Sequence, residues 1–311
     1  MVEVRQLGSS GLSTPRLVLG GNVFGWTATG DEAFSILDRF AEAGGLMVDT
    51  ADVYSSWVPG HRGGESETVI GEWLKRRGRA RGVAIATKVG YDDGLSAATI
   101  QAGVDASLRR LGVEAIDLYY AHKDDPETPL EETLGAFDAL VRSGKVRAIG
   151  ASNYSADRLA EALAISERES LARYTVLQPE YNLVRRDRFE GALQDLCVER
   201  GLGVLPYFGL ASGFLTGKYR SGADTGKSVR GDRMAAYLDV RGQRVLAALD
   251  DVAAQAGATQ AQVALAWLAA RPGVTAPIAS ATSVTQLEDL LGVLTLELSA
   301  EQMKQLTDAS D

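Results

Sequence analysis

Eight short, nearly continuous apolar runs recur along the 311-residue chain, and each ends in a small or polar residue. Runs with so little polar alternation are typical of strands buried on both faces of a parallel sheet. The ends of the first seven runs are 26 to 39 residues apart, about one strand–helix unit each. The runs are Arg16–Gly20, Gly45–Asp49, Val83–Lys88, Ala115–His122, Val146–Ser152, Tyr174–Gln178, Leu202–Tyr207 and Val274–Ala279.

Amphipathic segments with recognisable ends lie between these runs. Thr128–Glu131 has the pattern of a capping box with Pro129 as the first helical residue, and Gly144 ends that helix. Further helices are expected at Asp31–Ala43, Glu65–Arg77, Ser96–Leu111, Asp187–Glu199, Arg241–Gln255 and Thr259–Arg271. Eight such units predict a (β/α)8 TIM barrel that forms a single α/β domain over residues 1–311. An open doubly wound sheet is the alternative, because periodicity does not show whether a sheet closes.

Two segments depart from the regular repeat. Val4–Ser13 reads as an N-terminal β-hairpin, which we expect to close the bottom of the barrel. The interval between strands seven and eight is twice the usual length and holds extra helices. Its stretch Thr216–Arg244 carries seven basic and three acidic residues, although the whole chain has a net charge of −9. A long basic loop in an acidic protein predicts that it binds an anion.

Charge and composition exclude several classes of function. The acidic balance disfavours nucleic-acid and membrane-surface partners, and no apolar run approaches the length that crosses a bilayer. The N-terminus lacks a signal pattern, and a single cysteine, Cys197, cannot form an internal disulfide. We therefore expect a cytoplasmic protein in which Cys197 is a small buried side chain. With only His61 and His122, a histidine-rich metal centre is not expected.

Four polar side chains fall at or just beyond the ends of three successive strands, where a barrel places its active site. They are Asp49, Tyr54, Lys88 and His122. A lysine beside a phenol is expected to lower the pKa of the phenol, and an aspartate can hold that lysine in place. A histidine with a pKa near the working pH can orient a carbonyl oxygen or share its proton. This combination predicts delivery of a proton to an oxygen atom.

These residues belong to motifs that resemble the aldo-keto reductases over essentially the whole chain. The motifs are Asp49–Tyr54, Ala86–Lys88, Asp117–His122, Arg147–Asn153, Gln178–Asn182 and Gly213–Tyr219. The chain looks most similar to bacterial members related to the potassium-channel β-subunits. The resemblance implies a barrel that uses NADP(H) or NAD(H) without a Rossmann domain. The sequence has no Gly-x-Gly-x-x-Gly after its first strand, which agrees.

The resemblance also implies a role for each matching residue. Tyr54 would be the general acid in carbonyl reduction, Asp49 and Lys88 would tune it, and His122 would orient the substrate oxygen. Ser152, Asn153 and Gln178 match contacts to the nicotinamide amide, and Tyr207 matches the ring that stacks on nicotinamide. The other matching cofactor positions are Gly21, Asp49, Phe208, Gly209, Leu210, Ala211, Gly213, Thr216, Gly217 and Lys218, with Ala279, Ser280, Thr282, Gln286 and Asp289 for the adenosine half.

Three departures from the family pattern bear on the cofactor. Phe208–Leu210 stands where the family often reads Ser-Pro-Leu, and Gly209 makes the backbone there more mobile. Ser280–Ser283 has hydroxyl groups where the family commonly grips a 2′-phosphate with Lys or Arg. Leu290 stands where an asparagine often reads the adenine. NADP(H) remains the favoured cofactor, with NAD(H) as the alternative.

The substrate is expected to be a small-molecule carbonyl compound. Aromatic side chains that follow strand ends could line its pocket, namely Phe24, Trp26, Trp57 and Tyr91, together with Tyr54 and His122. One alternative is an NADP(H)-binding regulatory subunit with slow or vestigial turnover. The absence of a segment before the hairpin favours the enzyme. A metal-dependent barrel hydrolase or isomerase fits the sequence less well. Whether the chain is a monomer or a homo-oligomer stays open.

Overall fold

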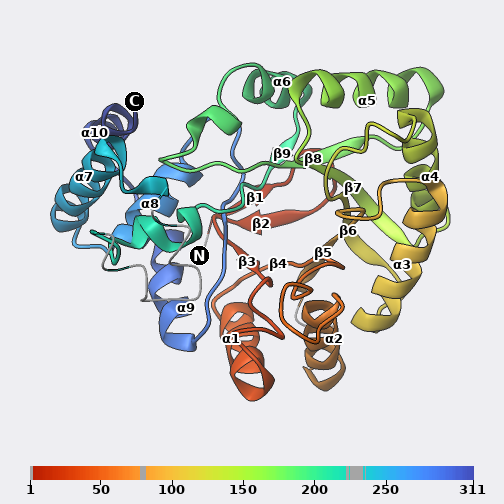
Figure 1. Ribbon diagram of the computed structural model, residues 1–311, viewed down its shortest axis with the longest axis horizontal. Coiled ribbons are helices and arrows are strands. Elements are labelled where there is room, and N and C mark those ends of the chain that lie inside the picture. Colours follow the sequence, from red (N-terminus) through yellow and green to blue (C-terminus); the bar gives the residue numbers. More distant parts are fainter. Residues whose placement is uncertain (1–2, 78–81, 222–223, 225–233, 235) are drawn as a thin grey trace.

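Eight parallel strands form one continuous sheet at the centre of the molecule, with the helices arranged around it (Figure 1). The structure is a computed structural model that describes residues 3–77, 82–221, 224, 234 and 236–311. The strand order is β10-β3-β4-β5-β6-β7-β8-β9, so each strand from β3 to β8 pairs with the next along the chain. The strands are β3 Val18–Gly20, β4 Met47–Asp49, β5 Ala84–Val89, β6 Ile116–Ala121, β7 Val146–Ser152, β8 Tyr174–Gln178, β9 Gly203–Val204 and β10 Ile278–Ala279.

Backbone hydrogen bonds close this sheet between β9 and β10. The Thr275 amide donates to the Val204 carbonyl at 2.9 Å, and the Ile278 amide donates to the Pro206 carbonyl at 2.9 Å. The predicted (β/α)8 barrel is therefore confirmed, and the open sheet is not observed. β9 and β10 are shorter than predicted because Pro206 and Pro277 interrupt both runs and have no amide hydrogen to donate.

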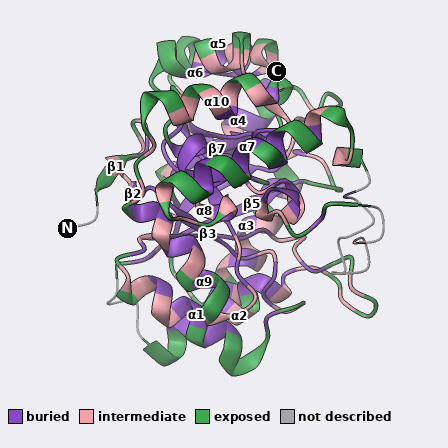
Figure 2. Cartoon of the chain, turned by 90° about the vertical axis from the view of Figure 1, so that its left-hand side faces the viewer, coloured by how far each residue is buried: buried purple, intermediate pink, exposed green. Residues whose placement is uncertain are grey.

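Ten α-helices in the described part of the chain cover the barrel, with their buried faces directed inward (Figure 2). They are α1 Gly30–Glu42, α2 Glu65–Arg77, α3 Ala97–Leu111, α4 Leu130–Arg142, α5 Ala156–Glu169, α6 Ala192–Arg200, α7 Val240–Ala256, α8 Gln260–Ala269, α9 Val284–Leu291 and α10 Ala300–Ser310. None of these helices is long and apolar enough to cross a membrane. The two extra helices predicted before the last strand are α7 and α8.

Helix ends follow the sequence signals in some places and not in others. Ser96 caps α3 by accepting the Thr99 amide, and Gly112 ends it in the left-handed conformation at φ 65°. The capping box predicted at Thr128 is wrong. The Thr128 hydroxyl instead donates to Asp125 at 2.7 Å. Helix α4 begins one residue later than predicted, after Pro129. The nearby aspartate acceptor competes successfully for the hydroxyl.

The predicted helix over Asp187–Glu199 is also interrupted. A 3-10 turn, Arg186–Arg188, precedes α6, and Gly191 separates them with φ 90°. Cys197 lies fully buried in α6, and burial raises the pKa of its thiol to about 12. The expectation of a small buried side chain at this position is confirmed.

The N-terminal hairpin closes one end of the barrel, as predicted. Strands β1 Val4–Gln6 and β2 Ser13–Pro15 pair antiparallel, and Leu7 after β1 is fully buried in the barrel interior. A Cβ added to Gly8, which has φ +55°, would lie 2.5 Å from the Gly203 amide nitrogen. This close approach seats the hairpin against the beginnings of the strands, so the carboxyl ends of the strands open toward the opposite face.

Candidate active site

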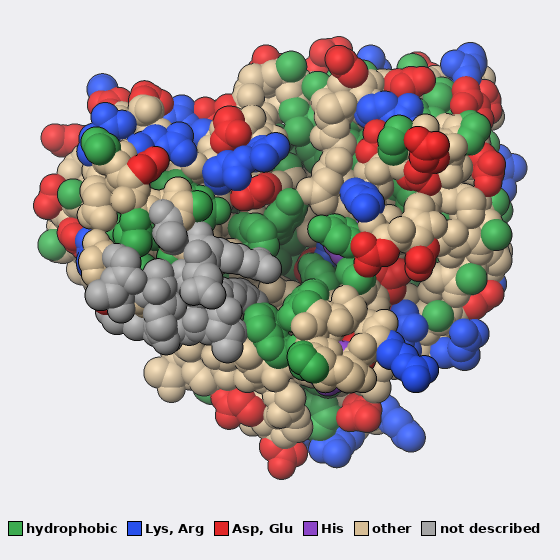
Figure 3. All heavy atoms as spheres, viewed as in Figure 1, with side chains coloured by type: hydrophobic (Ala, Val, Ile, Leu, Met, Phe, Trp, Pro, Cys, Tyr) green, Lys and Arg blue, Asp and Glu red, His purple; other side chains and the backbone are tan. Residues whose placement is uncertain are grey.

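The carboxyl ends of the strands bring the four predicted polar residues together. Asp49 is the last residue of β4, Lys88 lies near the end of β5, and His122 directly follows β6. Tyr54 stands in the loop after β4. Because neighbouring strands are parallel, their carboxyl ends meet on one face of the barrel, which Figure 3 views directly. This face is hollowed near its centre, with hydrophobic side chains around the hollow.

Lys88 is the centre of the cluster. Its side chain is 1% exposed, and its Nζ lies 2.7 Å from Asp49 Oδ2, 2.7 Å from the Thr50 carbonyl oxygen and 3.0 Å from the Tyr54 hydroxyl. These three contacts match the three hydrogens of an ammonium group. The lysine is therefore fixed in position, with one hydrogen directed at the phenol oxygen.

The pKa values of this cluster differ from the expectation in one respect. Burial lowers the pKa of Lys88, while Asp49 opposes that change. The pKa of Tyr54 lies well above its usual value because of burial and the adjacent Asp49 carboxylate. The pKa of Tyr54 is therefore raised and not lowered as expected, because burial of the phenol and the Asp49 carboxylate both disfavour the phenolate. Tyr54 consequently keeps its proton at neutral pH.

His122 is buried beside the phenol. Its ring centroid lies 6.1 Å from that of Tyr54 and 4.8 Å from that of Tyr91. Burial first, and then the charges of Lys88 and Lys123, hold the pKa of His122 well below its usual range. A pKa near the working pH was expected, and that expectation is wrong. A neutral imidazole can donate one hydrogen bond but brings no charge.

Hydrogen bonds extend the cluster to β7 and β8. Gln178 Nε2 donates to Asp49 Oδ1 at 2.8 Å, so both carboxylate oxygens of Asp49 are engaged. The Ser152 hydroxyl donates to the Gln178 carbonyl at 2.8 Å. Three residues predicted from three different strands are thus joined in one buried network.

Asn153 continues this network toward β9. Its Nδ2 donates to the His122 carbonyl at 2.9 Å, and its Oδ1 accepts the Tyr207 hydroxyl at 2.7 Å. Asn153 adopts a left-handed backbone conformation at φ 57°. This uncommon conformation is one that asparagine tolerates better than most residues. It places the amide and the Tyr207 ring together at the edge of the site.

The chain after β9 has an unusual run of left-handed residues. Phe208, Ala211 and Ser212 have φ values of 54°, 47° and 57°, and Gly213 follows at 105°. Non-glycine residues are strained in this region, and such strain clusters where a segment holds a ligand. Turns of this kind direct successive backbone amides toward one point and can bind an anion. Within the segment, the Ala211 amide donates to the Phe208 carbonyl at 2.7 Å and the Gly213 amide donates to the Leu210 carbonyl at 2.8 Å.

Side chains in the rest of this segment have their own partners. The Thr216 hydroxyl donates to the Gly213 carbonyl at 2.8 Å, and Lys218 Nζ lies 5.1 Å from the Tyr219 ring centroid. Gly217, Gly209 and Leu210 lie in the same segment, and Gly209 packs near Leu265. Lys227, Arg230 and Arg233 of the basic loop lie outside the described residues.

The residues expected near the adenosine half follow β10. The Ser280 hydroxyl donates to Asn22 Oδ1 at 2.6 Å, and the Thr282 amide and hydroxyl both donate to Gln286 Oε1. Asp289 accepts from the Thr259 hydroxyl at 2.9 Å, so its carboxylate contacts the beginning of α8. Ala279 ends β10.

Gly21 serves the local fold. Its amide donates to the Asp49 carbonyl at 2.7 Å, and an added Cβ would lie 2.9 Å from that oxygen. The glycine therefore lets β3 approach the end of β4 closely.

Of the four aromatic residues predicted to line a pocket, Trp57 contacts the phenol, Tyr91 contacts the imidazole, and Trp26 contacts Trp57. The Trp57 ring centroid is 6.2 Å from that of Tyr54 and 5.6 Å from that of Trp26, and 48% of Trp57 is exposed. Tyr91 is 44% exposed and contacts His122. Phe24 differs, because it is fully buried in the core. The structure does not bring Phe24 to the exposed wall.

Sequence reasoning missed two parts of the site. The Thr50 carbonyl is a direct partner of Lys88, but a backbone acceptor leaves no residue-type signal. Lys123, whose Nζ lies 4.9 Å from the Tyr91 ring centroid, could have been noticed because it immediately follows His122. No group of three or more metal-ligating side chains occurs among the described residues.

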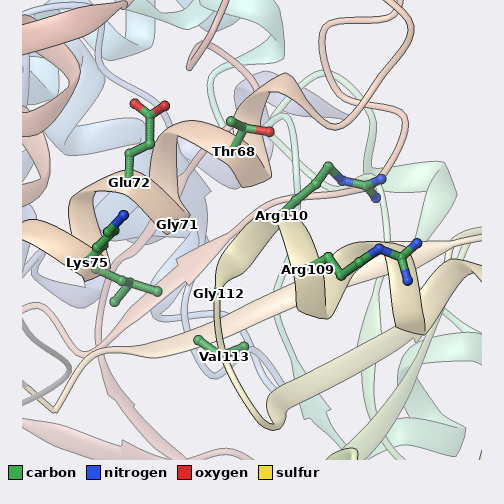
Figure 4. A pocket seen from close by; sticks show the side chains of 9 residues that line it. Thr68, Gly71, Glu72, Lys75, Arg109, Arg110, Gly112 and Val113 are labelled. Atoms are coloured by element: carbon green, nitrogen blue, oxygen red, sulfur yellow. The ribbon is translucent and has the colours of Figure 1, made fainter.

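Two cavities lie elsewhere on the molecule. One of about 420 Å³ lies between α2 and α3 and is lined by Glu72, Lys75 and Arg109 among others (Figure 4). The other, of about 500 Å³, lies beside the hairpin and includes Asp117 and Arg147. Neither contains a residue of the polar network at the strand ends.

Known proteins with similar sequences include oxidoreductases and proteins described as potassium channel subunits. An uncharacterized oxidoreductase from Bacillus subtilis is 35% identical, covering 99% of this chain and 95% of that protein. A protein described as a probable voltage-gated potassium channel subunit beta from Arabidopsis thaliana is 33% identical, covering 93% and 90%. An L-glyceraldehyde 3-phosphate reductase from Escherichia coli is 32% identical, covering 98% and 91%. Residues 16–311 match the model of the aldo/keto reductase family, and the chain therefore belongs to that family.

Proposed function

We propose that this protein is an NAD(P)H-dependent reductase that converts an aldehyde or ketone into an alcohol, with Tyr54 as the proton donor. The observation that carries the proposal is the contact of one buried ammonium group with both Asp49 and the Tyr54 hydroxyl. The bound nicotinamide supplies the hydride in such a reaction. The protein must then deliver a proton to the carbonyl oxygen as negative charge develops there.

Each residue of the cluster has a part in that delivery. Tyr54 holds a proton at neutral pH, and because burial and Asp49 raise its pKa, its donation requires stabilisation of the phenolate. As the phenol gives up its proton, Lys88 donates a hydrogen bond to the developing phenolate. Asp49 fixes Lys88 in the required position. The neutral His122 imidazole orients the carbonyl by a hydrogen bond and is not the proton source.

The cofactor would lie across the carboxyl ends of β7 to β10. Ser152, Asn153 and Gln178 would bind the nicotinamide amide, and the Tyr207 ring would stack on nicotinamide. The left-handed turn at residues 208–213 supports a pyrophosphate site. NADP(H) is favoured, and NAD(H) is the alternative because Ser280–Ser283 contains no Lys or Arg. We further propose that the chain acts as a single domain in the cytoplasm.

Similarity to proteins described as potassium channel β subunits favours a second candidate function. In this candidate the chain binds NADP(H), turns over slowly and forms a stable complex with a partner. Gel filtration and affinity capture from lysate of the source organism would discriminate, because a regulatory subunit occurs in a larger stable assembly.

The substitution Tyr54→Phe tests the enzymatic proposal. We expect it to lower kcat for 4-nitrobenzaldehyde reduction by about 100-fold or more, since a general acid typically contributes that much. NADPH and NADH consumption would be followed in parallel, and cofactor binding would be measured by quenching of tryptophan fluorescence. Cofactor affinity should change little. Turnover at the wild-type rate would show that Tyr54 is not the acid.

A further inference from the structure

A lysine stands at the rim of the site, directly after His122. Lys123 Nζ lies 4.9 Å from the centroid of the Tyr91 ring, and that ring lies 4.8 Å from the His122 ring. An ammonium held over an aromatic face is fixed more closely than a freely moving surface lysine. The charge of Lys123 is therefore held next to the residue that would orient the substrate carbonyl.

The neighbouring carboxylates do not neutralise this charge. Asp124 pairs with Arg158 at 2.9 Å, and Asp125 accepts the Leu95 amide and the Thr128 hydroxyl. Among the described residues no carboxylate forms an ion pair with Lys123. The side chain is half-buried, so solvent screens it less than a fully exposed lysine.

The two ring contacts limit how far this charge lies from the reaction centre. Because Tyr91 touches both groups, Lys123 Nζ cannot lie more than about 10 Å from the His122 ring centroid. That is the span of a benzene ring with one substituent at each end. A substrate whose carbonyl meets Tyr54 and His122 could present its far end to Lys123.

Aromatic rings offer the surface between these two ends. Trp57 and Tyr91 are both substantially exposed, and they flank Tyr54 and His122 respectively. Such rings favour a flat or apolar middle portion of a ligand. The arrangement combines a polar end at the phenol, an aromatic wall and a cation at the rim.

We propose that the substrate carries an anionic group, such as a carboxylate or phosphate, remote from its carbonyl, and that Lys123 binds this group. The inference rests on the proposed reductase function and deepens it by naming the substrate class. Lys123 is then a specificity residue that takes no part in proton transfer. Its effect should appear in kcat/KM for anionic carbonyl compounds and not in that for neutral ones.

Matched aldehydes and matched lysine variants test the proposal. The substrates are 4-carboxybenzaldehyde, its neutral methyl ester and 4-formylphenyl phosphate, which share one ring and one aldehyde. The variants are Lys123→Met, which keeps the length but removes the charge, and Lys123→Arg, which keeps the charge. Lys75→Met, an exposed lysine on α2, is the control.

We expect Lys123→Met to lower kcat/KM about five- to tenfold for the anionic aldehydes and less than twofold for the ester, as suits a partly screened charge pair. Lys123→Arg should retain most of the preference for the anionic aldehydes over the neutral ester. In the wild type, added salt should reduce this preference. The larger loss, for carboxylate or for phosphate, identifies the anion preferred.

Two results would overturn the inference and are distinguishable. If Lys123→Met changed kcat/KM equally for all three substrates, or for none of them, Lys123 would not select for substrate charge. The proposed reductase function would then still stand. If the wild-type protein reduced none of these aldehydes with either cofactor, the proposed function would fail, and this inference with it.

Discussion

Asp52 is a half-buried acid three residues after Asp49 that takes no part in the proposed proton transfer. Its Oδ1 atom is buried and has no hydrogen-bond partner among the described residues. Burial and the nearby Glu67 carboxylate raise the pKa of Asp52 to about 7, although Arg110 and Lys88 act against this. The folded protein therefore binds a proton that the unfolded chain has already lost between about pH 4 and pH 7.

This linkage predicts that stability falls as pH rises toward 7. The stabilising effect of the bound proton is complete below the unfolded pKa and is lost as pH passes the folded value. Between pH 5 and pH 8, the unfolding free energy of the wild type should fall by about 2 kcal/mol more than that of Asp52→Asn, because the asparagine does not titrate. Urea denaturation at both pH values measures this difference. Asp93→Asn, at an exposed position, is the control. Equal pH dependence in wild type and Asp52→Asn would contradict the assignment.

At the scale of single residues, the positions of residues in the sequence predicted where the site lies but not the pKa values of its side chains. Strand ends and motif spacing were sufficient to predict that Asp49, Tyr54, Lys88 and His122 would meet. The directions of the pKa changes at Tyr54 and His122 depend on how deeply each ring is buried and on the sum of all nearby charges. Neither quantity can be read from residue types along the chain.

At the scale of elements, one glycine makes room for a large side chain inside the barrel. Tyr120 of β6 pairs in register with Gly150 of β7, and a Cβ on Gly150 would lie 2.6 Å from the Tyr120 ring and 2.9 Å from the Val176 carbonyl oxygen. The Tyr120 ring centroid is 5.9 Å from Lys88 Nζ. Gly150 therefore lets Tyr120 fill the barrel interior beneath Lys88.

We expect Gly150→Ala to lower the unfolding free energy by about 1–3 kcal/mol, because overpacking displaces the ring or the strand. Displacing Tyr120 should also lower kcat. Gly135→Ala in α4 is a control of opposite sign, since nothing lies within 4 Å of its added Cβ and alanine favours the helix by about 0.5–1 kcal/mol. Urea denaturation of both variants measures the difference. A Gly150→Ala protein as stable as the wild type would refute the packing argument.

The presence of each strand and helix was easier to predict from the sequence than the residues at which it begins and ends. All eight strands form where apolar runs occur, because burial on both faces requires such runs. The ends of β9, β10 and α4 depend on competition between hydrogen-bond partners that lie far apart in sequence or in loops. The Thr128 hydroxyl, for example, binds Asp125 in place of a helix amide.

At the scale of the whole molecule, the N-terminal hairpin supplies part of the barrel core. Leu7 packs inside the barrel with Val18, Met47 and Leu205, and Arg5 donates to the Ala269 carbonyl at 2.8 Å. We expect Leu7→Ala to lower the unfolding free energy by about 2–5 kcal/mol, as for other buried leucines. Val4→Ala, at a residue that is 50% exposed, should cost well under 1 kcal/mol. Thermal and urea denaturation would compare the two, and equal losses would show that the hairpin is dispensable.

Fold class and hairpin were both predictable, because hydrophobic period and repeat length constrain the arrangement of layers. Closure of the sheet was an inference from the number of units. The bonds that achieve it join residues about 70 positions apart, at Thr275 and Val204. No local pattern encodes such a contact.

The place where the sheet closes has a consequence for the lifetime of the protein in the cell. β9 and β10 are two residues each, and a few backbone bonds join their edges. Tyr207, proposed to stack on nicotinamide, and the segment proposed to hold the pyrophosphate follow β9, and the residues proposed for adenosine follow β10. One dinucleotide would therefore contact both edges. A ligand that binds only the closed barrel stabilises it by about 2.7 kcal/mol at a hundred times its Kd. On the proposed function, resistance to proteolysis would therefore rise and fall with the supply of reduced cofactor.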